Sequence, residues 1–259
     1  MTTILAIHGW LDNAASFIPL IEQLPEYHWQ AIDLVGHGHS SHRPPKSHYH
    51  FIDWVTDLHD FIVEMDYQKP PIIVGHSLGG FIATVFAGLF PNLLSRLVLI
   101  DAAGLVIQND KRVIEDMRDA MNLRVGQESK SIKQPQSLKS AIKARQQAGD
   151  LSEPAARYLI ERNTNTFPDS NLITWRTDHR LRSRSPLRFS KEAAQKIISE
   201  INVPLLILLA EEGYDDVKKA YKFFSAHYPS HTQKNVKGNH HCHLEFPAET
   251  AEQIRRFLL

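Results

Sequence analysis

Gly75-His76-Ser77-Leu78-Gly79-Gly80 is the stretch that decides the fold of this chain. It directly follows a short apolar run, residues 71–74, and opens a second apolar segment, Phe81–Ala87. This context predicts a strand, a sharp turn and then a helix, with Ser77 at the apex of the turn. The flanking glycines lack a Cβ where strand and helix nearly touch, and the first helix amides face a developing oxyanion. We therefore predict that Ser77 is a nucleophile.

Three further motifs lie at other points of the chain. They are Ile4-Leu5-Ala6-Ile7-His8-Gly9-Trp10, Asp33-Leu34-Val35-Gly36-His37-Gly38-His39-Ser40 and Gly238-Asn239-His240-His241-Cys242-His243-Leu244-Glu245-Phe246-Pro247. Together with the serine motif they resemble the α/β-hydrolase superfamily, in the branch that carries a cap domain. The segment Trp175-Arg176-Thr177-Asp178-His179-Arg180-Leu181 is similar to the cap end of the serine hydrolase-like proteins. The resemblance spans residues 3–258.

Composition excludes several classes of function. Lys plus Arg and Asp plus Glu each number 29 among 259 residues, so the net charge is zero. This gives no electrostatic reason to expect binding to nucleic acid or to an anionic membrane. The longest apolar runs, such as Pro204–Ala210, have the length of core strands and are too short for a membrane span.

The single cysteine and the first residues bear on location. Cys242 cannot form an internal disulfide, which fits a reducing compartment, and we expect it to be a buried spectator thiol. Met1-Thr2-Thr3 enters a strand without a basic stretch, so no signal peptide is expected. Both observations favour a cytoplasmic location.

Strand-like and helical patterns alternate along the chain, which predicts an α/β fold with a mostly parallel, doubly wound sheet. The apolar strand-like runs are Ile4–Ile7, Trp29–Ile32, Ile72–Val74, Leu97–Ile100, Leu205–Leu209 and Thr232–Val236. Apolar residues at helical spacing mark Phe51–Met65, Leu78–Leu89, Lys191–Ile201 and Ala248–Leu258.

Residues 105–188 break this alternation. The segment is more polar, has helical spacing at Lys111–Leu123, Leu138–Ala148 and Pro154–Arg162, and shows no convincing strand. Because the chain returns to core strands afterwards, we predict a helical cap inserted into a core formed by residues 1–104 and 189–259. A lid over the site is the common use of such an insertion, and a surface elaboration is the alternative.

The resemblance also raises a question at the edge of the sheet. Family members usually begin with a two-strand hairpin, which is absent before the first strand here, so the strand at Trp29–Ile32 becomes an edge. An uncovered edge invites pairing. We therefore expect either a covering segment, with Pro44–His50 as the candidate, or a homodimer contact along Trp29–Asp33.

The winding of the predicted sheet reverses between the strand ending at His8 and the strand ending at Gly75, and ligands bind at such points. The resemblance implies that the backbone amides of Trp10 and Leu78 form the oxyanion hole. The Trp10 ring either lines an acyl pocket or fills the core.

The register of the C-terminal motif implies that His240 is the catalytic base and that His243 faces structure. The alternative for this histidine cluster is metal binding. Carboxylates paired at ligand spacing are lacking there, so the sequence favours no metal site. Five other histidines fall in the polar loop after the second strand, and we expect them to be exposed. They are His37, His39, His42, His48 and His50.

The acid of the triad is the hardest residue to assign. Family members most often carry it nine residues after the proline that opens the penultimate strand, but counting from Pro204 gives Gly213. The family also uses the position after the preceding core strand, which is Asp101 here, although many relatives keep a structural Asp there. We favour Asp101 over a group of nearby carboxylates. That group is Glu211, Glu212, Asp215 and Asp216.

These observations predict a serine hydrolase without a cofactor, acting on a small to medium carboxylic ester through an acyl-enzyme. A serine in place of aspartate argues against epoxide hydrolase or dehalogenase chemistry. Thioesterase, lactonase and carbon–carbon bond hydrolysis with the same residues remain alternatives. A non-catalytic scaffold on the same fold is the alternative from another class.

Overall fold

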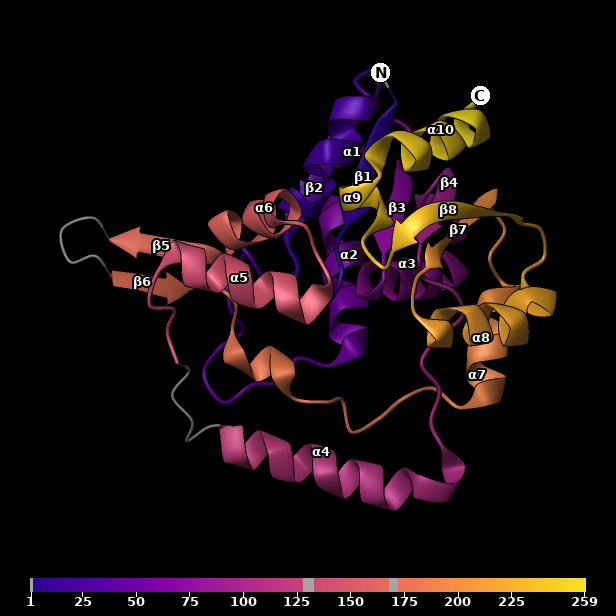
Figure 1. Cartoon of the computed structure of the whole chain (residues 1–259). Coiled ribbons are helices and arrows are strands. Elements are labelled where there is room, and N and C mark those ends of the chain that lie inside the picture. The colour runs from indigo at the N-terminus through magenta and orange to yellow at the C-terminus, as the bar shows by residue number, and fades with distance from the viewer. Residues whose placement is uncertain (1, 128–132, 168–171) are drawn as a thin grey trace.

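The computed structural model describes residues 2–127, 133–167 and 172–259. Its centre is a six-stranded parallel sheet with the order β2-β1-β3-β4-β7-β8 (Figure 1). The strands are β1 Thr3–Ile7, β2 His28–Ile32, β3 Ile72–His76, β4 Arg96–Ile100, β7 Leu205–Glu212 and β8 Thr232–Asn239. The chain moves outward from β1 to β2 and then returns to the other side of β1 with β3. This confirms the predicted sheet and its reversal point.

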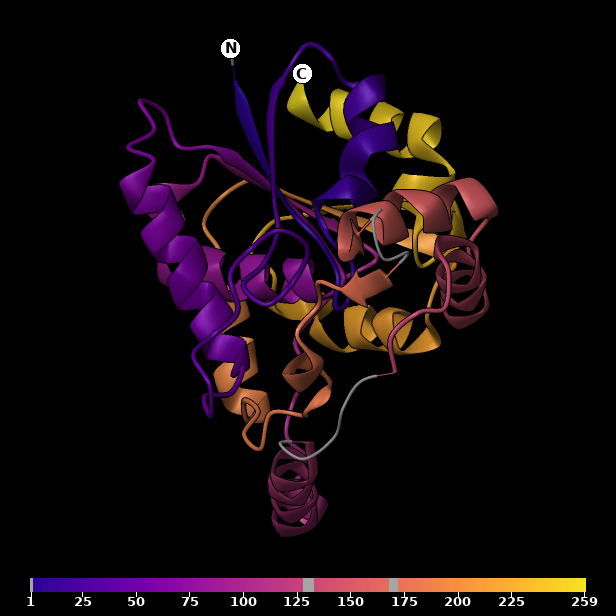
Figure 2. The same ribbon diagram turned by 90° about the vertical axis from the view of Figure 1, so that its left-hand side faces the viewer.

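Helices cover both faces of the sheet, as the two views in Figures 1 and 2 show. In β1 the side chains of Ile4 and Ala6 face one layer and those of Leu5 and Ile7 face the other, because alternate strand residues point to opposite faces. One layer contains α1 Ile18–Gln23, α9 Cys242–Glu245 and α10 Pro247–Leu258. The other contains α2 Phe51–Glu64, α3 Leu78–Leu89, α7 Lys191–Ser199 and α8 Asp215–Phe224.

Short 3₁₀ turns complete the core and the connections. They occupy Ala14–Phe17, Pro91–Leu93, Asp110–Arg112, His179–Arg182 and Ser225–His227. Within the described ranges, no helix is both long and apolar enough to cross a bilayer.

The insertion between β4 and β7 is helical but not wholly so. Its helices are α4 Val113–Gln127, α5 Leu138–Gly149 and α6 Glu153–Asn163, close to the predicted segments. The expectation of no strand was wrong, because β5 Thr164–Phe167 and β6 Leu172–Trp175 pair as an antiparallel hairpin. Both strands are only four residues long, and their β-branched and aromatic residues are interrupted by polar ones, which hid the pattern.

The strand β2 lies at the sheet edge, as predicted, and its only partner among the described strands is β1. Arg180 donates to the backbone oxygens of Pro44 and Ser47, which ties the loop at Pro44–His50 to the end of the cap. Covering of the β2 edge by this loop and a homodimer contact along Trp29–Asp33 both stay predictions.

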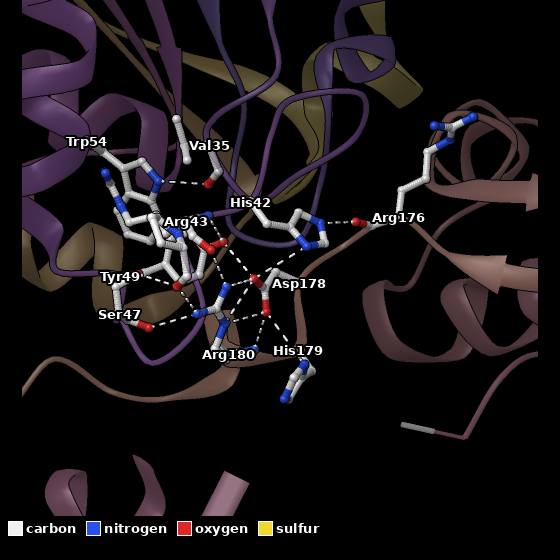
Figure 3. A network of polar contacts seen from close by, with 11 residues as sticks. Val35, His42, Arg43, Ser47, Tyr49, Trp54, Arg176, Asp178, His179 and Arg180 are labelled. Atoms are coloured by element: carbon white, nitrogen blue, oxygen red, sulfur yellow. Dashed lines mark hydrogen bonds and ion pairs between the residues drawn. The ribbon is translucent and has the colours of Figure 1, made fainter. Parts of the chain in front are cut away.

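A buried polar network fastens the cap end to the core (Figure 3). Asp178 accepts hydrogen bonds from the Tyr49 hydroxyl at 2.8 Å and from Arg180 Nη2 at 2.6 Å, and its own amide donates to Gly36 O. Burial alone would raise the pKa of Asp178, but hydrogen bonds from Arg180 and Tyr49 lower it to about 2. The charged carboxylate therefore holds residues 175–182 against the loop after β2.

Candidate active site

Ser77 lies between β3 and α3 in a strained backbone conformation, with φ 50° and ψ −117°. Its amide donates to Ile100 O at 3.2 Å, which ties the turn to β4. A Cβ on Gly79 would lie 2.1 Å from Ile7 O, and one on Gly75 would lie 2.6 Å from Gly79 O. Only glycine fits at both positions, so the two glycines permit the turn that presents the serine.

His240 and Asp101 are 139 residues apart in the sequence and meet beside this turn. His240 Nδ1 lies 2.6 Å from Asp101 Oδ2, and Asp101 is fully buried at the end of β4. A carboxylate only accepts, so Nδ1 carries a hydrogen, and in the neutral ring the lone pair is on Nε2. The amide of Ala210 donates to the other oxygen, Oδ1, at 3.1 Å. Asp101 itself has φ 40°, a second strained residue in the site.

Gly213 makes room for Asp101. A Cβ on Gly213 would lie 2.5 Å from Asp101 Oδ1 and 2.6 Å from Oδ2. A side chain at position 213, where the resemblance implies the usual acid, and the side chain of Asp101 would therefore compete for one space. The alternative carboxylates, Glu211, Glu212, Asp215 and Asp216, are all exposed, and the last two begin α8.

Ser77 and His240 line the same cavity, whose volume is about 460 Å³. The cap supplies much of its wall, including Ala141 and Ala144 of α5 and Ile160 of α6. A cavity of this size, walled in part by an insertion and lined by a strained serine and a histidine, is suited to a small or medium organic substrate.

The model of the α/β-hydrolase fold matches residues 2–247. The chain belongs to the α/β-hydrolase family. A "Probable serine hydrolase" of Drosophila melanogaster is 32% identical over 98% of this chain and 80% of its own length. The "Serine hydrolase-like protein" of Danio rerio is 27% identical over 98% of this chain and 81% of its own. The crystal structure of a hypothetical protein from Pseudomonas aeruginosa PAO1 superposes with a TM-score of 0.89 at 29% identity, covering 99% and 90% of the two chains.

The two amides that the resemblance assigns to the oxyanion hole of this α/β hydrolase lie at the expected turns. Leu78 is the first residue of α3, so its N–H has no acceptor within the helix. Trp10 follows His8 and Gly9 beyond the end of β1. Its ring is 49% exposed and lines the cavity, and its indole N–H donates to Leu181 O at 3.0 Å. Of the two expectations for the ring, lining the pocket fits the structure and filling the core does not.

The loop histidines do not all behave as predicted. His39 and His42 are exposed and His48 and His50 are half-buried, but His37 is fully buried. Positive φ angles at Gly36 and Gly38 curl the loop so that His37 Nε2 accepts from the Leu11 amide at 3.2 Å. Burial lowers the pKa of His37 to about 3, so the ring is neutral.

His243 and Cys242 fill the core next to the site. The His243 ring is fully buried against Phe17, 5.1 Å between ring centres, and burial lowers its pKa to about 3. Both ring nitrogens lack a partner among the described residues. Burial also raises the pKa of Cys242 to about 12, so the expected buried thiol stays protonated. Both residues face structure, in agreement with the sequence.

We expect His243 to make the fold sensitive to acid. The folded chain keeps this ring neutral down to about pH 3 while the unfolded chain protonates it near pH 6.5, so stability falls as pH drops through that window. At pH 5 the neutral His243 ring lowers the free energy of unfolding by about 2 kcal/mol. Between pH 7 and pH 5 the free energy of unfolding, measured by urea titration, should therefore fall by about 2 kcal/mol less in His243→Leu than in the wild type. His28→Leu, at an exposed histidine, should keep the wild-type slope; equal slopes for all three proteins would contradict this.

Four residues near the site were not found by sequence reasoning. Tyr214 stacks on His240 with ring centres 4.1 Å apart. Asp12, His76 and Arg145 form a polar cluster at the cavity wall, in which Arg145 Nη2 lies 2.5 Å from Asp12 Oδ1. Tyr214 could have been found from the sequence, because it directly follows Gly213, the position considered for the acid of the triad. The cluster joins residues far apart in sequence, so no local pattern could predict it.

Proposed function

We propose that this α/β hydrolase is a serine hydrolase that cleaves a small to medium carboxylic ester through an acyl-enzyme. The observation that carries the proposal is the short contact between His240 Nδ1 and the buried Asp101, because His240 lines the same cavity as the strained Ser77. A carboxylate that fixes the tautomer of a histidine beside a presented serine is the arrangement of a catalytic triad.

In the proposed reaction Ser77 Oγ attacks the ester carbonyl carbon while its proton passes to His240 Nε2. The carbonyl oxygen becomes an oxyanion, held by the amides of Trp10 and Leu78, each of which contributes about 3 kcal/mol. The oxyanion then collapses and expels the alcohol, which takes the proton from Nε2. Water repeats the sequence on the acyl-enzyme and releases the acid. Asp101 stabilises the imidazolium in both halves.

The cap sets the substrate in this proposal. We place it at residues 105–188, and α5 and α6 bring Ala141, Ala144 and Ile160 to the cavity wall. Small apolar residues there leave room for an acyl or alcohol group. We also propose a cytoplasmic location, because the one thiol is buried and forms no disulfide.

Related reactions use the same residues, and the cavity alone does not separate them. A panel of p-nitrophenyl esters of increasing acyl length, acyl-CoA thioesters, lactones and vinylogous diketones distinguishes the reactions by relative kcat/KM. Highest turnover on the esters supports the proposal. Turnover on thioesters, lactones or diketones alone replaces it with one of those activities, and no turnover on any class favours a non-catalytic scaffold.

Gly213→Ala should damage the site without touching a reacting group. The new Cβ would lie 2.5 Å from Asp101 Oδ1, so the carboxylate must move away from His240. Since a misplaced triad group costs about 10²-fold, we expect kcat to fall by that order while KM changes little. Gly126→Ala is the matched control, because among the described residues no atom clashes with a Cβ added there. Full activity in Gly213→Ala would show that the position of the Asp101 carboxylate does not require the absence of a side chain at Gly213.

A further inference from the structure

Three buried side chains from three different segments converge at the wall of the cavity. Asp12 follows β1, His76 ends β3, and His241 follows β8; they are 1%, 0% and 4% exposed. Asp12 Oδ2 lies 3.1 Å from His241 Nε2 and 3.8 Å from His76 Nδ1, and all three atoms lie within 4.8 Å of one another. In a tetrahedral zinc site the ligand atoms are about 3.3 Å apart, so this spacing is close to that of metal ligands.

The tautomer of His76 is fixed by its outer nitrogen. Nε2 lies 2.8 Å from the backbone oxygen of His240, which can only accept, so Nε2 carries the hydrogen. The other nitrogen, Nδ1, then presents a lone pair toward Asp12 Oδ2, which cannot donate either. Nδ1 is buried and has no hydrogen-bond partner within the described ranges. Two buried acceptors face one another, and a cation between them would satisfy both.

His241 is in a similar position. Its Nε2 is 3.1 Å from Asp12 Oδ2 and 3.3 Å from Arg145 Nη2, a group that can only donate. One nitrogen cannot both donate to the carboxylate and accept from the guanidinium, so one of these contacts is unsatisfied. Arg145 comes from cap helix α5 and also holds the second oxygen of Asp12. The positive group nearest this cluster is therefore supplied by the cap.

Gly9 leaves space beside the cluster. A Cβ there would lie 2.9 Å from His76 Nδ1 and 3.0 Å from Asp12 Oδ2. Asp12 and His241 also line the cavity, which gives an ion a route from solvent.

We propose that Asp12 Oδ2, His76 Nδ1 and His241 Nε2 bind a divalent transition metal ion of the Zn²⁺ class, in competition with Arg145. Two imidazoles and one carboxylate suit zinc, with a fourth position open toward the cavity, whereas Ca²⁺ and Mg²⁺ prefer oxygen ligands. The hydrogen of Nε2 on His76, bonded to a backbone carbonyl, is the outer contact that holds a metal-binding imidazole in place.

Such an ion would inhibit the proposed reaction. The rings of His76 and His241 lie 4.7 and 5.3 Å from that of His240, centre to centre. A divalent cation held by them disfavours the imidazolium that His240 forms during acyl transfer, so kcat should fall about tenfold or more at saturation. This inhibition rests on the proposed function, whereas binding of the ion does not.

The test is titration of metal-free protein with Zn²⁺ by calorimetry, with Co²⁺ absorption as a report on tetrahedral coordination. We expect one Zn²⁺ per chain. Asp12→Asn, His241→Gln and Gly9→Ala should each weaken binding about tenfold or more. Arg145→Gln should strengthen it by removing the competing cation. Thermal unfolding without metal identifies any variant that has failed to fold. The Zn²⁺ affinities of the folded variants then test the assigned site.

Two controls locate the ion. His243→Gln changes a neighbouring buried histidine and should bind as the wild type does, and His240→Ala should also retain Zn²⁺. Binding lost in His240→Ala but kept in Asp12→Asn would place the ion on the catalytic histidine and overturn the proposal. So would no binding, weaker binding in Arg145→Gln, or binding unaffected by Asp12→Asn and His241→Gln. If Zn²⁺ inhibited the enzyme while Asp12→Asn, His241→Gln and Gly9→Ala all bound Zn²⁺ as the wild type does, the assigned site would be contradicted. Zn²⁺ binding in a protein that turns over no ester would contradict the proposed function alone.

Discussion

Ser77→Ala is expected to lower the ester kcat by about 10⁶-fold, because loss of the nucleophile leaves only binding and the oxyanion amides. The residue sits at φ 50°, and alanine adds no atom that the serine lacks, so the fold should persist. Initial rates on the best ester of the panel, with thermal unfolding in parallel, measure both effects.

Ser16→Ala is a matched control for this variant. Ser16 is fully buried, and its hydroxyl has no hydrogen-bond partner within the described ranges. It should keep wild-type turnover. A Ser77→Ala protein with undiminished kcat and a normal unfolding transition would remove the basis of the hydrolase proposal.

Asp101→Asn is expected to lower kcat by about 10⁴-fold, by analogy with the same change in a serine protease triad. The amide keeps the shape of the side chain and tolerates φ 40°, but it loses the charge that stabilises the imidazolium and selects the wrong tautomer. Because the defect lies in the transition state, KM should change much less than kcat. Steady-state kinetics separate the two.

The competing carboxylates provide the comparison for Asp101. All four are exposed, and Asp216 is 95% exposed beside Lys219, so their removal should leave most activity. The variants are Glu211→Gln, Glu212→Gln, Asp215→Asn and Asp216→Asn. If one of these were as inactive as Asp101→Asn is expected to be, the acid would belong to the end of β7 or to the start of α8, and Asp101 would have a structural role.

The fold was predictable because its core strands are short apolar runs with strong local signals. The runs at Ile4–Ile7 and Leu97–Ile100 are fully buried strands, and the helix predicted at Leu78–Leu89 has those bounds in the structure. The β5–β6 hairpin was missed, since four-residue strands in a polar insertion are fixed by pairing and packing rather than by hydrophobic alternation.

At the candidate site, motif order predicted Ser77 and His240, and the glycine at position 213 led the sequence analysis to favour Asp101 as the acid. The sequence excluded Gly213 for lack of a side chain, and the structure gives the complementary fact that this lack leaves room for Asp101. We predicted from the polarity of its loop that His37 is exposed. The prediction failed because the polarity of a loop does not reveal the positive φ angles at Gly36 and Gly38 that turn His37 inward. The cluster of Asp12, His76 and His241 could not be predicted, because it forms only where three separate segments of the chain meet.

The central claim is that Ser77 is an activated nucleophile. Incubation with a fluorophosphonate, followed by intact-mass and peptide mass spectrometry, tests it most directly because the reagent phosphonylates serines activated by a base. We predict one phosphonate per chain, on the peptide containing Ser77, with labelling lost in Ser77→Ala and strongly slowed in Asp101→Asn. Labelling at another residue, or no labelling of the folded wild-type protein, would contradict the account.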